Sequence, residues 1–434
     1  MRKISIAIFL AALAASGAQG QLPGNKQPGL EAGQETPITI GKRIEFRSAI
    51  LSDTVSMNIY LPDGFEVSSR EHTYPVIFIN GGHGNRFFPT LAGMVKLLSE
   101  RERIPESIVV SLNDMGDIPL IYTHGMWGAK TLGGSGDPQL SVQHLEKEVI
   151  PFLEKNYRAN SYRLIIGVSG SSLFPIYTFT HAPDLFRSHI LVAAADMIGM
   201  GYAQDKTFLD AFEEALAEAP KRRAKLYLGV ADSDIQKRLD YQTNLDELER
   251  RFGQSTALDL RVEVVPKADH YEVFIKAVQS ALEQNFPHEL WASRYRDLVA
   301  EPGDALENID KYYRELSKRV GFDVLPRADR WNSVNCLRFI TRHLIALDRT
   351  EEAVAVAQRR VQYQPTVAAS FSGLADAYEA NHQLKEAAEA LEQEIRLAKA
   401  LPVTDDRTRA IRSTTLTAAE ERLRSLKEKI AEQG

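Results

Sequence analysis

A serine at a sharp glycine-rich turn is the first candidate for chemistry. The segment Gly167-Val168-Ser169-Gly170-Ser171 follows an apolar run and precedes an amphipathic stretch. A serine on such a strand-to-helix turn projects above the sheet edge, provided that its neighbours two positions away are small. Gly167 meets this requirement, and Ser171 meets it although glycine is usual there. We therefore predict Ser169 as a nucleophile and the Gly170 amide as a donor to a developing oxyanion.

Such a serine needs an acid and a base, which lie further along the chain on loops after later strands. His270 follows the apolar run 260–265 and is the predicted base, which takes the serine proton and returns it to the leaving group. Asp232 and Asp234 follow the apolar run 225–230, and either can fix the imidazole tautomer. Turn and cap chemistry is the ordinary alternative for both, so one can be catalytic while the other caps.

A second oxyanion donor is expected from the glycine-rich stretch 80–84, which we read as a loop after another apolar run. Glycines let the backbone approach a substrate carbonyl closely, and we assign the donor to the Gly82 amide. His83 is expected to line the substrate pocket, together with Tyr122 and Trp127 from a later loop. No spaced ligands accompany His83, so no metal is predicted, and no organic cofactor is implied.

These residues require a parallel sheet to position them. Short apolar runs alternate with amphipathic stretches of helical length, and such runs are typical of strands buried on both faces. The alternation predicts an α/β fold with a mostly parallel central sheet, preceded by a hairpin at 43–61. The expected strands are 75–80, 107–112, 163–168, 189–194, 225–230 and 260–265, and the expected helices include 141–156, 208–217, 238–251 and 272–284.

The chain changes character after Pro287, where strand-like runs cease and Ala, Glu, Leu and Arg dominate. A self-match at a spacing of about 34 residues pairs Glu352-Ala353 with Glu386-Ala387. This pattern resembles the tetratricopeptide repeat (TPR), although two unrelated amphipathic hairpins give a similar match. We predict an all-α TPR-like domain at 288–434, ending in a charged capping helix.

The region 38–286 resembles an esterase family of the α/β-hydrolase superfamily, which includes esterase D, siderophore esterases, feruloyl esterases and mycolyltransferases. The most specific stretch is 146–186. It contains Glu148-Val149-Ile150-Pro151-Phe152 before the serine turn, and Pro183, Leu185 and Phe186 after it.

The resemblance implies an α/β-hydrolase domain at 37–287 that cleaves carboxylic esters through an acyl-enzyme. Its histidine falls on His270. Its acid lies three residues past a small residue that ends the strand, and Ala231 takes that place, which favours Asp234 over Asp232. The family usually has glycine where Ser171 stands, so the hydroxyl here either alters the turn or adds a hydrogen bond.

The N-terminus predicts export. Arg2 and Lys3 precede an apolar run at 4–15 that is too short for a stable membrane anchor, and Ala18-Gln19-Gly20 fits a signal-peptidase site. We expect a signal peptide at 1–20, a flexible leader at 21–36, and a bacterial periplasmic or extracellular location. The single cysteine excludes an intrachain disulfide, which suits that location.

The composition, with 44% hydrophobic and 25% charged residues, is that of a globular protein, and a net charge of −6 without a basic patch argues against a nucleic-acid partner. The leading hypothesis is a serine esterase that acts on a small-molecule ester. An acyltransferase with the same triad is one alternative. A catalytically inactive hydrolase-like protein, whose repeats recruit a protein partner, is the other.

Overall fold

The computed structural model describes residues 37–112, 138–203, 206–217, 223–291, 294–330, 333–403 and 406–433. Every strand and helix discussed below lies in one compact unit, Ile40–Gly434. The predicted signal peptide and leader, at 1–36, lie outside the described residues.

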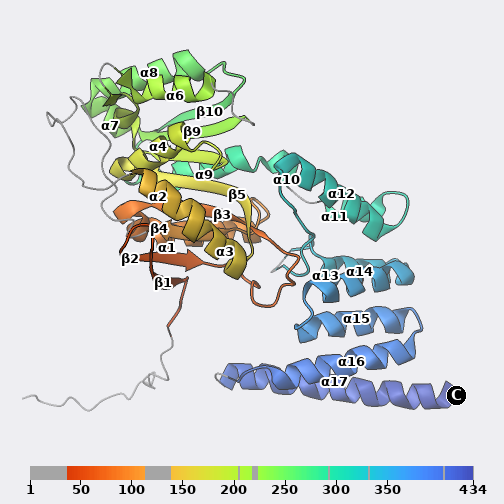
Figure 1. The fold of residues 1–434 in the computed structure, drawn as a ribbon. Coiled ribbons are helices and arrows are strands. Elements are labelled where there is room, and N and C mark those ends of the chain that lie inside the picture. The colour runs from red at the N-terminus through yellow and green to blue at the C-terminus, as the bar shows by residue number, and fades with distance from the viewer. Residues whose placement is uncertain are drawn as a thin grey trace, which may run out of the picture. The chain divides into compact units, whose positions relative to one another are not determined.

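The part of the chain from β1 to β10 is built around an eight-stranded sheet with the strand order β1-β2-β4-β3-β5-β6-β9-β10 (Figure 1). β1 (Lys42–Arg47) and β2 (Thr54–Tyr60) form an antiparallel hairpin, and β2 also pairs antiparallel with β4. The other neighbours are parallel, which confirms the predicted mostly parallel sheet. The parallel strands are β3 (Tyr74–Asn80), β4 (Ile108–Leu112), β5 (Ala159–Val168), β6 (Ser188–Val192), β9 (Ala224–Ala231) and β10 (Leu258–Val265).

Helices cover both faces of this sheet because its strands are apolar on both sides. Ile77 and Ile79 of β3 face a core built with α1 (Gly81–Glu100) and α9 (Val273–Asn285). Phe78, between them, faces the opposite core. Each fully buried side chain of this size contributes roughly 1.5–3 kcal/mol to folding. The helices on the opposite face are α2 (Pro138–His144), α3 (Ile150–Tyr157), α4 (Leu173–His181), α6 (Phe208–Ala217) and α8 (Leu239–Phe252).

The glycine-rich stretch 80–84 begins a helix, so its interpretation as a loop was wrong. α1 starts at Gly81, whose φ of 74° turns the chain sharply from strand into helix. The apolar residues further along the segment recur at helical spacing, and their burial favours a helix despite the glycines at its start. The residues that α1 buries in the core are Phe88, Leu91, Ala92 and Val95.

The region after the sheet is helical among its described residues, as predicted. α12 shows how sequence sets its helix ends: the Asp304 side chain accepts a hydrogen bond from the Glu307 N–H at 2.9 Å, and Gly321 ends the helix with φ 84°. The helices are α10 (His288–Trp291), α11 (Tyr295–Ala300), α12 (Ala305–Val320), α13 (Leu337–Ala346), α14 (Thr350–Tyr363), α15 (Ala368–Ala380), α16 (Leu384–Ala400) and α17 (Asp406–Gln433).

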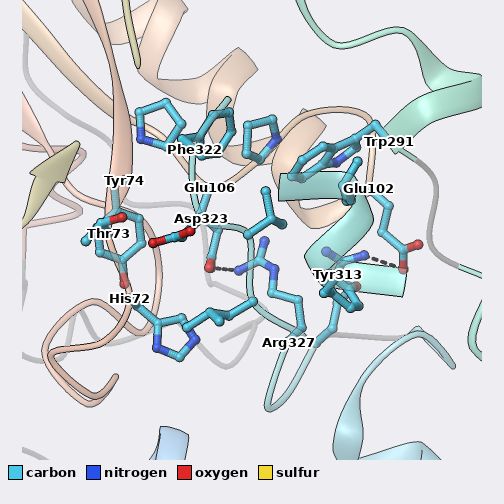
Figure 2. Close-up of a pocket in the computed structure, with 16 residues that line it drawn as sticks. His72, Thr73, Tyr74, Glu102, Glu106, Trp291, Tyr313, Phe322, Asp323 and Arg327 are labelled. Carbon is cyan, nitrogen blue, oxygen red and sulfur yellow. Dashed lines mark ion pairs between the residues drawn. The ribbon is translucent and has the colours of Figure 1, made fainter. Parts of the chain in front are cut away.

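A segment between α12 and α13 joins this region to the sheet domain. Arg327 forms an ion pair with Glu106, and Arg330 forms one with Glu102. Phe322 packs on Tyr162 of β5, with ring centroids 4.9 Å apart. These contacts border a cavity of about 50 Å³ (Figure 2), which contains none of the predicted site residues.

Candidate active site

The predicted site residues follow strands whose carboxyl ends meet at one edge of the sheet. Ser169 directly follows β5, Asp234 lies in the short helix α7 (Asp232–Lys237) after β9, and His270 follows β10. The ends of β9 and β10 are in register, with Ala231 opposite Val265. Loops at the carboxyl edge of a parallel sheet are the usual place for a ligand site in this class of fold.

The three side chains form a continuous hydrogen-bonded chain. His270 Nε2 lies 2.9 Å from Ser169 Oγ, and His270 Nδ1 lies 2.7 Å from Asp234 Oδ2. A neutral imidazole protonated at Nδ1 donates to the Asp234 carboxylate and accepts from the Ser169 hydroxyl. The Asp234 side chain is only 8% exposed, whereas His270 is 30% exposed. The carboxylate is therefore shielded from water while the imidazole can reach a substrate.

Asp232 has a different set of contacts. Its carboxylate accepts hydrogen bonds from the backbone N–H groups of Lys267 at 2.8 Å and Ala268 at 3.2 Å, and these bonds lower its pKa. Asp269 accepts hydrogen bonds from the N–H groups of Glu272 and Tyr271, which lower its pKa as well. The two aspartates thus fix the loop on either side of the histidine.

The turn that carries the serine is strained and tightly packed. Ser169 has φ 49°, which is the left-handed conformation that non-glycine residues rarely adopt. A Cβ on Gly167 would lie 2.4 Å from Ser172 Cα, so the position admits only glycine without a backbone shift. This arrangement is the strand–turn–helix geometry expected of a nucleophile elbow.

Of the two predicted oxyanion donors, Gly170 lies in this turn and Gly82 lies in the adjacent helix α1. Gly82 lies in the first turn of α1, where backbone N–H groups have no acceptor within the helix. A Cβ on Gly81 would lie 3.1 Å from Ser171 Cβ, so the start of α1 adjoins the elbow. A Cβ on Gly170 would meet no atom within 4 Å, which leaves open space beside that residue.

The predicted pocket residues are not described by the structure. Tyr122 and Trp127 lie in the segment 113–137, and the side chain of His83 is also outside the described part. Within the described residues, no group of three or more His, Cys, Asp or Glu side chains is placed to hold a metal ion. In the same residues, no helix has the length and apolar character needed to cross a membrane.

Sequence reasoning missed the contacts around the elbow. Asn80 Nδ2 donates to the Ser171 carbonyl at 3.0 Å, and the Tyr271 ring packs edge-on against the His270 ring at 4.8 Å. The one available signal for Asn80 was its polarity at the end of an otherwise apolar strand.

Two solved structures of low sequence identity share the fold with TM-scores of 0.50 or more. An IroE-like serine hydrolase from Shewanella oneidensis is 19% identical with a TM-score of 0.53, and 74% of this chain covers 98% of that one. An uncharacterised protein from Capnocytophaga ochracea is 15% identical with a TM-score of 0.50, over 88% of this chain and 99% of that one. The siderophore hydrolase EstB from Aspergillus nidulans is 13% identical with a TM-score of 0.48, over 61% of this chain and 100% of that one.

No curated protein sequence matches the chain. The family described as Putative esterase matches residues 48–287, which is more than half of the 434 residues. This match spans the elbow and both later site loops, and it supports ester hydrolysis. The chain belongs to this esterase family.

Proposed function

We propose that the protein is a serine esterase that hydrolyses small carboxylic esters through Ser169, His270 and Asp234. The observation that carries the proposal is the unbroken hydrogen-bonded chain from the serine hydroxyl through the imidazole to a buried carboxylate. An inactive, purely partner-binding protein would have no need to maintain a strained serine in this contact.

The proposed reaction has two halves. Ser169 Oγ attacks the ester carbonyl while His270 Nε2 takes its proton, and the resulting imidazolium then protonates the departing alkoxide. Water attacks the acyl-enzyme in the second half, with the imidazole again acting as base, and releases the acid product and the free serine. Asp234 holds the imidazole orientation and stabilises the imidazolium.

The N–H groups of Gly82 and Gly170 are the proposed donors to the oxyanion of each tetrahedral intermediate. The first follows Gly81 at the start of α1 and the second precedes Ser171 in the elbow, and the chain approaches itself closely at Gly81 and Ser171. Backbone donors fixed in this way need no reorganisation as charge develops, and loss of a single such donor costs about 10²–10³-fold in kcat.

We propose in addition that the helical region is TPR-like. α14 and α16 begin 34 positions apart, at Thr350 and Leu384. The matched small residues Ala353 and Ala387 are both fully buried, as close helix packing requires. Export remains a proposal from the N-terminal sequence, and N-terminal sequencing of the mature protein tests it: a start near Gln21 supports cleavage, and an intact Met1 contradicts it.

The first experiment is hydrolysis of short p-nitrophenyl esters by the wild type, Ser169→Ala and Ser172→Ala. Ser172 is a matched control because it lies three residues from the nucleophile and its buried hydroxyl has no hydrogen-bond partner among the described residues. Turnover by the wild type and the control, with none above background by Ser169→Ala, supports the proposal. A wild type that neither turns over nor reacts with a fluorophosphonate contradicts it. Product analysis with an added alcohol then separates hydrolysis from acyl transfer.

A further inference from the structure

Asn80 is a buried amide at the end of β3, where every other residue of the strand is also buried. The residue is 2% exposed, and its Oδ1 accepts no hydrogen bond from the described residues. A half-satisfied amide is unfavourable in a core position, where an apolar side chain would fit without an unmet hydrogen bond. The hydrogen bond that Asn80 does make, from Nδ2 to the Ser171 carbonyl at 3.0 Å, therefore calls for a reason.

Ser171 closes the nucleophile turn from the other side. Its hydroxyl accepts from the Val168 N–H and donates to the Val168 carbonyl, both at 2.9 Å. The side chain thus ties the residue after Gly170 back to the residue before Ser169. A glycine at this position, which the motif usually has, can make neither bond.

The partners of Ser171 belong to both oxyanion segments. Asn80 and Gly81 immediately precede Gly82 at the start of α1, and a Cβ on Gly81 would come within 3.1 Å of Ser171 Cβ. Gly170 immediately precedes Ser171 in the elbow. One hydrogen bond therefore joins the two backbone segments that carry the proposed donors, and the segments approach closely at Gly81 and Ser171.

We propose that Asn80 and Ser171 form a clamp that sets the separation of the two oxyanion donors, and that both are positioning residues for the esterase reaction. The inference rests on the proposed function. Preorganised donors stabilise the transition state only when they are correctly placed, and a displacement of about 1 Å in an active site can cost 10²-fold in rate. The clamp should therefore act on kcat more than on substrate binding.

The test compares Asn80→Ala and Ser171→Ala with the wild type, using Ser172→Ala as the matched control. Active sites are titrated with a fluorophosphonate, and kcat per titrated site, KM and the inhibition constant of a boronic acid are measured with p-nitrophenyl acetate. We expect kcat per site to fall about tenfold in each clamp variant, KM to change less than about twofold, and boronic acid binding to weaken in parallel with kcat. The control keeps the wild-type values.

A merely structural role would lower the melting temperature or the titrated fraction and leave kcat per site unchanged, and that outcome overturns the clamp. Ser171→Gly provides a second variant that the turn accommodates, and we expect the same loss from it. The Asn80→Ala/Ser171→Ala double variant should lose about as much kcat per site as the more impaired of the two single variants, because losses within one network are not additive. Losses of kcat in the two single variants that multiply in the double variant overturn the clamp.

An inert wild type overturns the proposed function and the clamp together, whereas an active wild type with an unimpaired Asn80→Ala overturns the clamp alone.

Discussion

Asp234 Oδ2 lies 2.7 Å from His270 Nδ1, whereas the carboxylate of Asp232 points to backbone N–H groups. Both aspartates occupy the first turn of the same short helix. Residue type and spacing alone did not decide which of the two aspartates orients the histidine. The structure separates their contacts completely, and this separation makes their roles testable by the same substitution at each position.

Asp234→Asn should abolish most of the activity without unfolding the protein. An amide can donate to His270 Nδ1 and so favours the tautomer that cannot accept the serine proton, for which a loss of about 10⁴-fold in kcat is typical. Asp232→Asn should keep most of kcat and lower the melting temperature, because it weakens the bonds to Lys267 and Ala268. Ester hydrolysis and thermal unfolding measure the two effects. The reverse pattern would assign the acid to Asp232.

Gly167→Ala should disrupt the elbow. Its Cβ would lie 2.4 Å from Ser172 Cα, so the backbone must move, and overpacking of this kind typically costs about 1–3 kcal/mol. Gly170→Ala is the matched control for stability, since a Cβ there would meet no atom within 4 Å. We expect a lower melting temperature and loss of fluorophosphonate labelling for Gly167→Ala, and a melting temperature near that of the wild type for Gly170→Ala. Equal melting temperatures in the two variants contradict the packing argument.

The sheet was largely predictable because its signal is local. The run expected as a strand at 225–230 is β9, Ala224–Ala231, and the helix expected at 208–217 is α6 with the same bounds. Continuous apolar runs predict buried strands and apolar residues at helical spacing predict helices, and both patterns can be recognised within a short stretch of sequence. Where local composition misled, as at Gly81, the apolar positions further along α1 decided the structure.

The contacts of the site were less predictable because they join distant residues. Asn80 and Ser171 are 91 positions apart, and neither residue type predicts the other. The hydrogen bond between Asn80 and Ser171 depends on β3 and β5 being neighbours in the sheet, and no local sequence pattern predicts that neighbourhood. The position of a residue just after a strand predicts that it lies at the carboxyl edge of the sheet. Which of these side chains are in contact depends on the three-dimensional arrangement of the backbone.

The ion pair between Glu102 and Arg330 should be asymmetric in its effect on stability. Their side chains are 13% and 7% exposed, and burial lowers the pKa of Arg330 to about 10. Glu102→Gln leaves this buried guanidinium without its counter-charge, for which about 3–5 kcal/mol is typical. Arg330→Met should destabilise less, because Glu102 keeps hydrogen bonds from Ser333 and Asn335.

Chemical denaturation of the two single variants and the double variant tests this asymmetry. We expect Glu102→Gln to lower the free energy of unfolding most, and Arg330→Met to restore part of that loss when combined with it, because the double variant has no unpaired buried charge. Equal losses that add in the double variant would show that the pair contributes nothing specific to the contact between the sheet domain and the helical region.

Glu148 should make stability dependent on pH in the acid range. Burial alone would raise the pKa of its carboxyl group, but hydrogen bonds from Ser48, His144 and the N–H groups of Ala49 and Ile50 outweigh burial and hold the pKa below the usual 4.5. A pKa that is lower in the folded state means that the ionised carboxylate stabilises the fold. That stabilisation is complete above pH 4.5 and is lost as the pH falls through the folded pKa.

The matched variant for this prediction is Glu148→Gln, which keeps the shape of the side chain and removes its charge. We expect its melting temperature to be lower than that of the wild type at pH 7, because the amide replaces an anion that accepts bonds from the loop after β1. The difference should shrink as the pH is lowered from 4.5 toward 3, where the wild-type carboxyl becomes protonated. A difference that stays constant from pH 7 to pH 3 would show that shape and packing, rather than the ionised carboxylate, account for the contribution of Glu148.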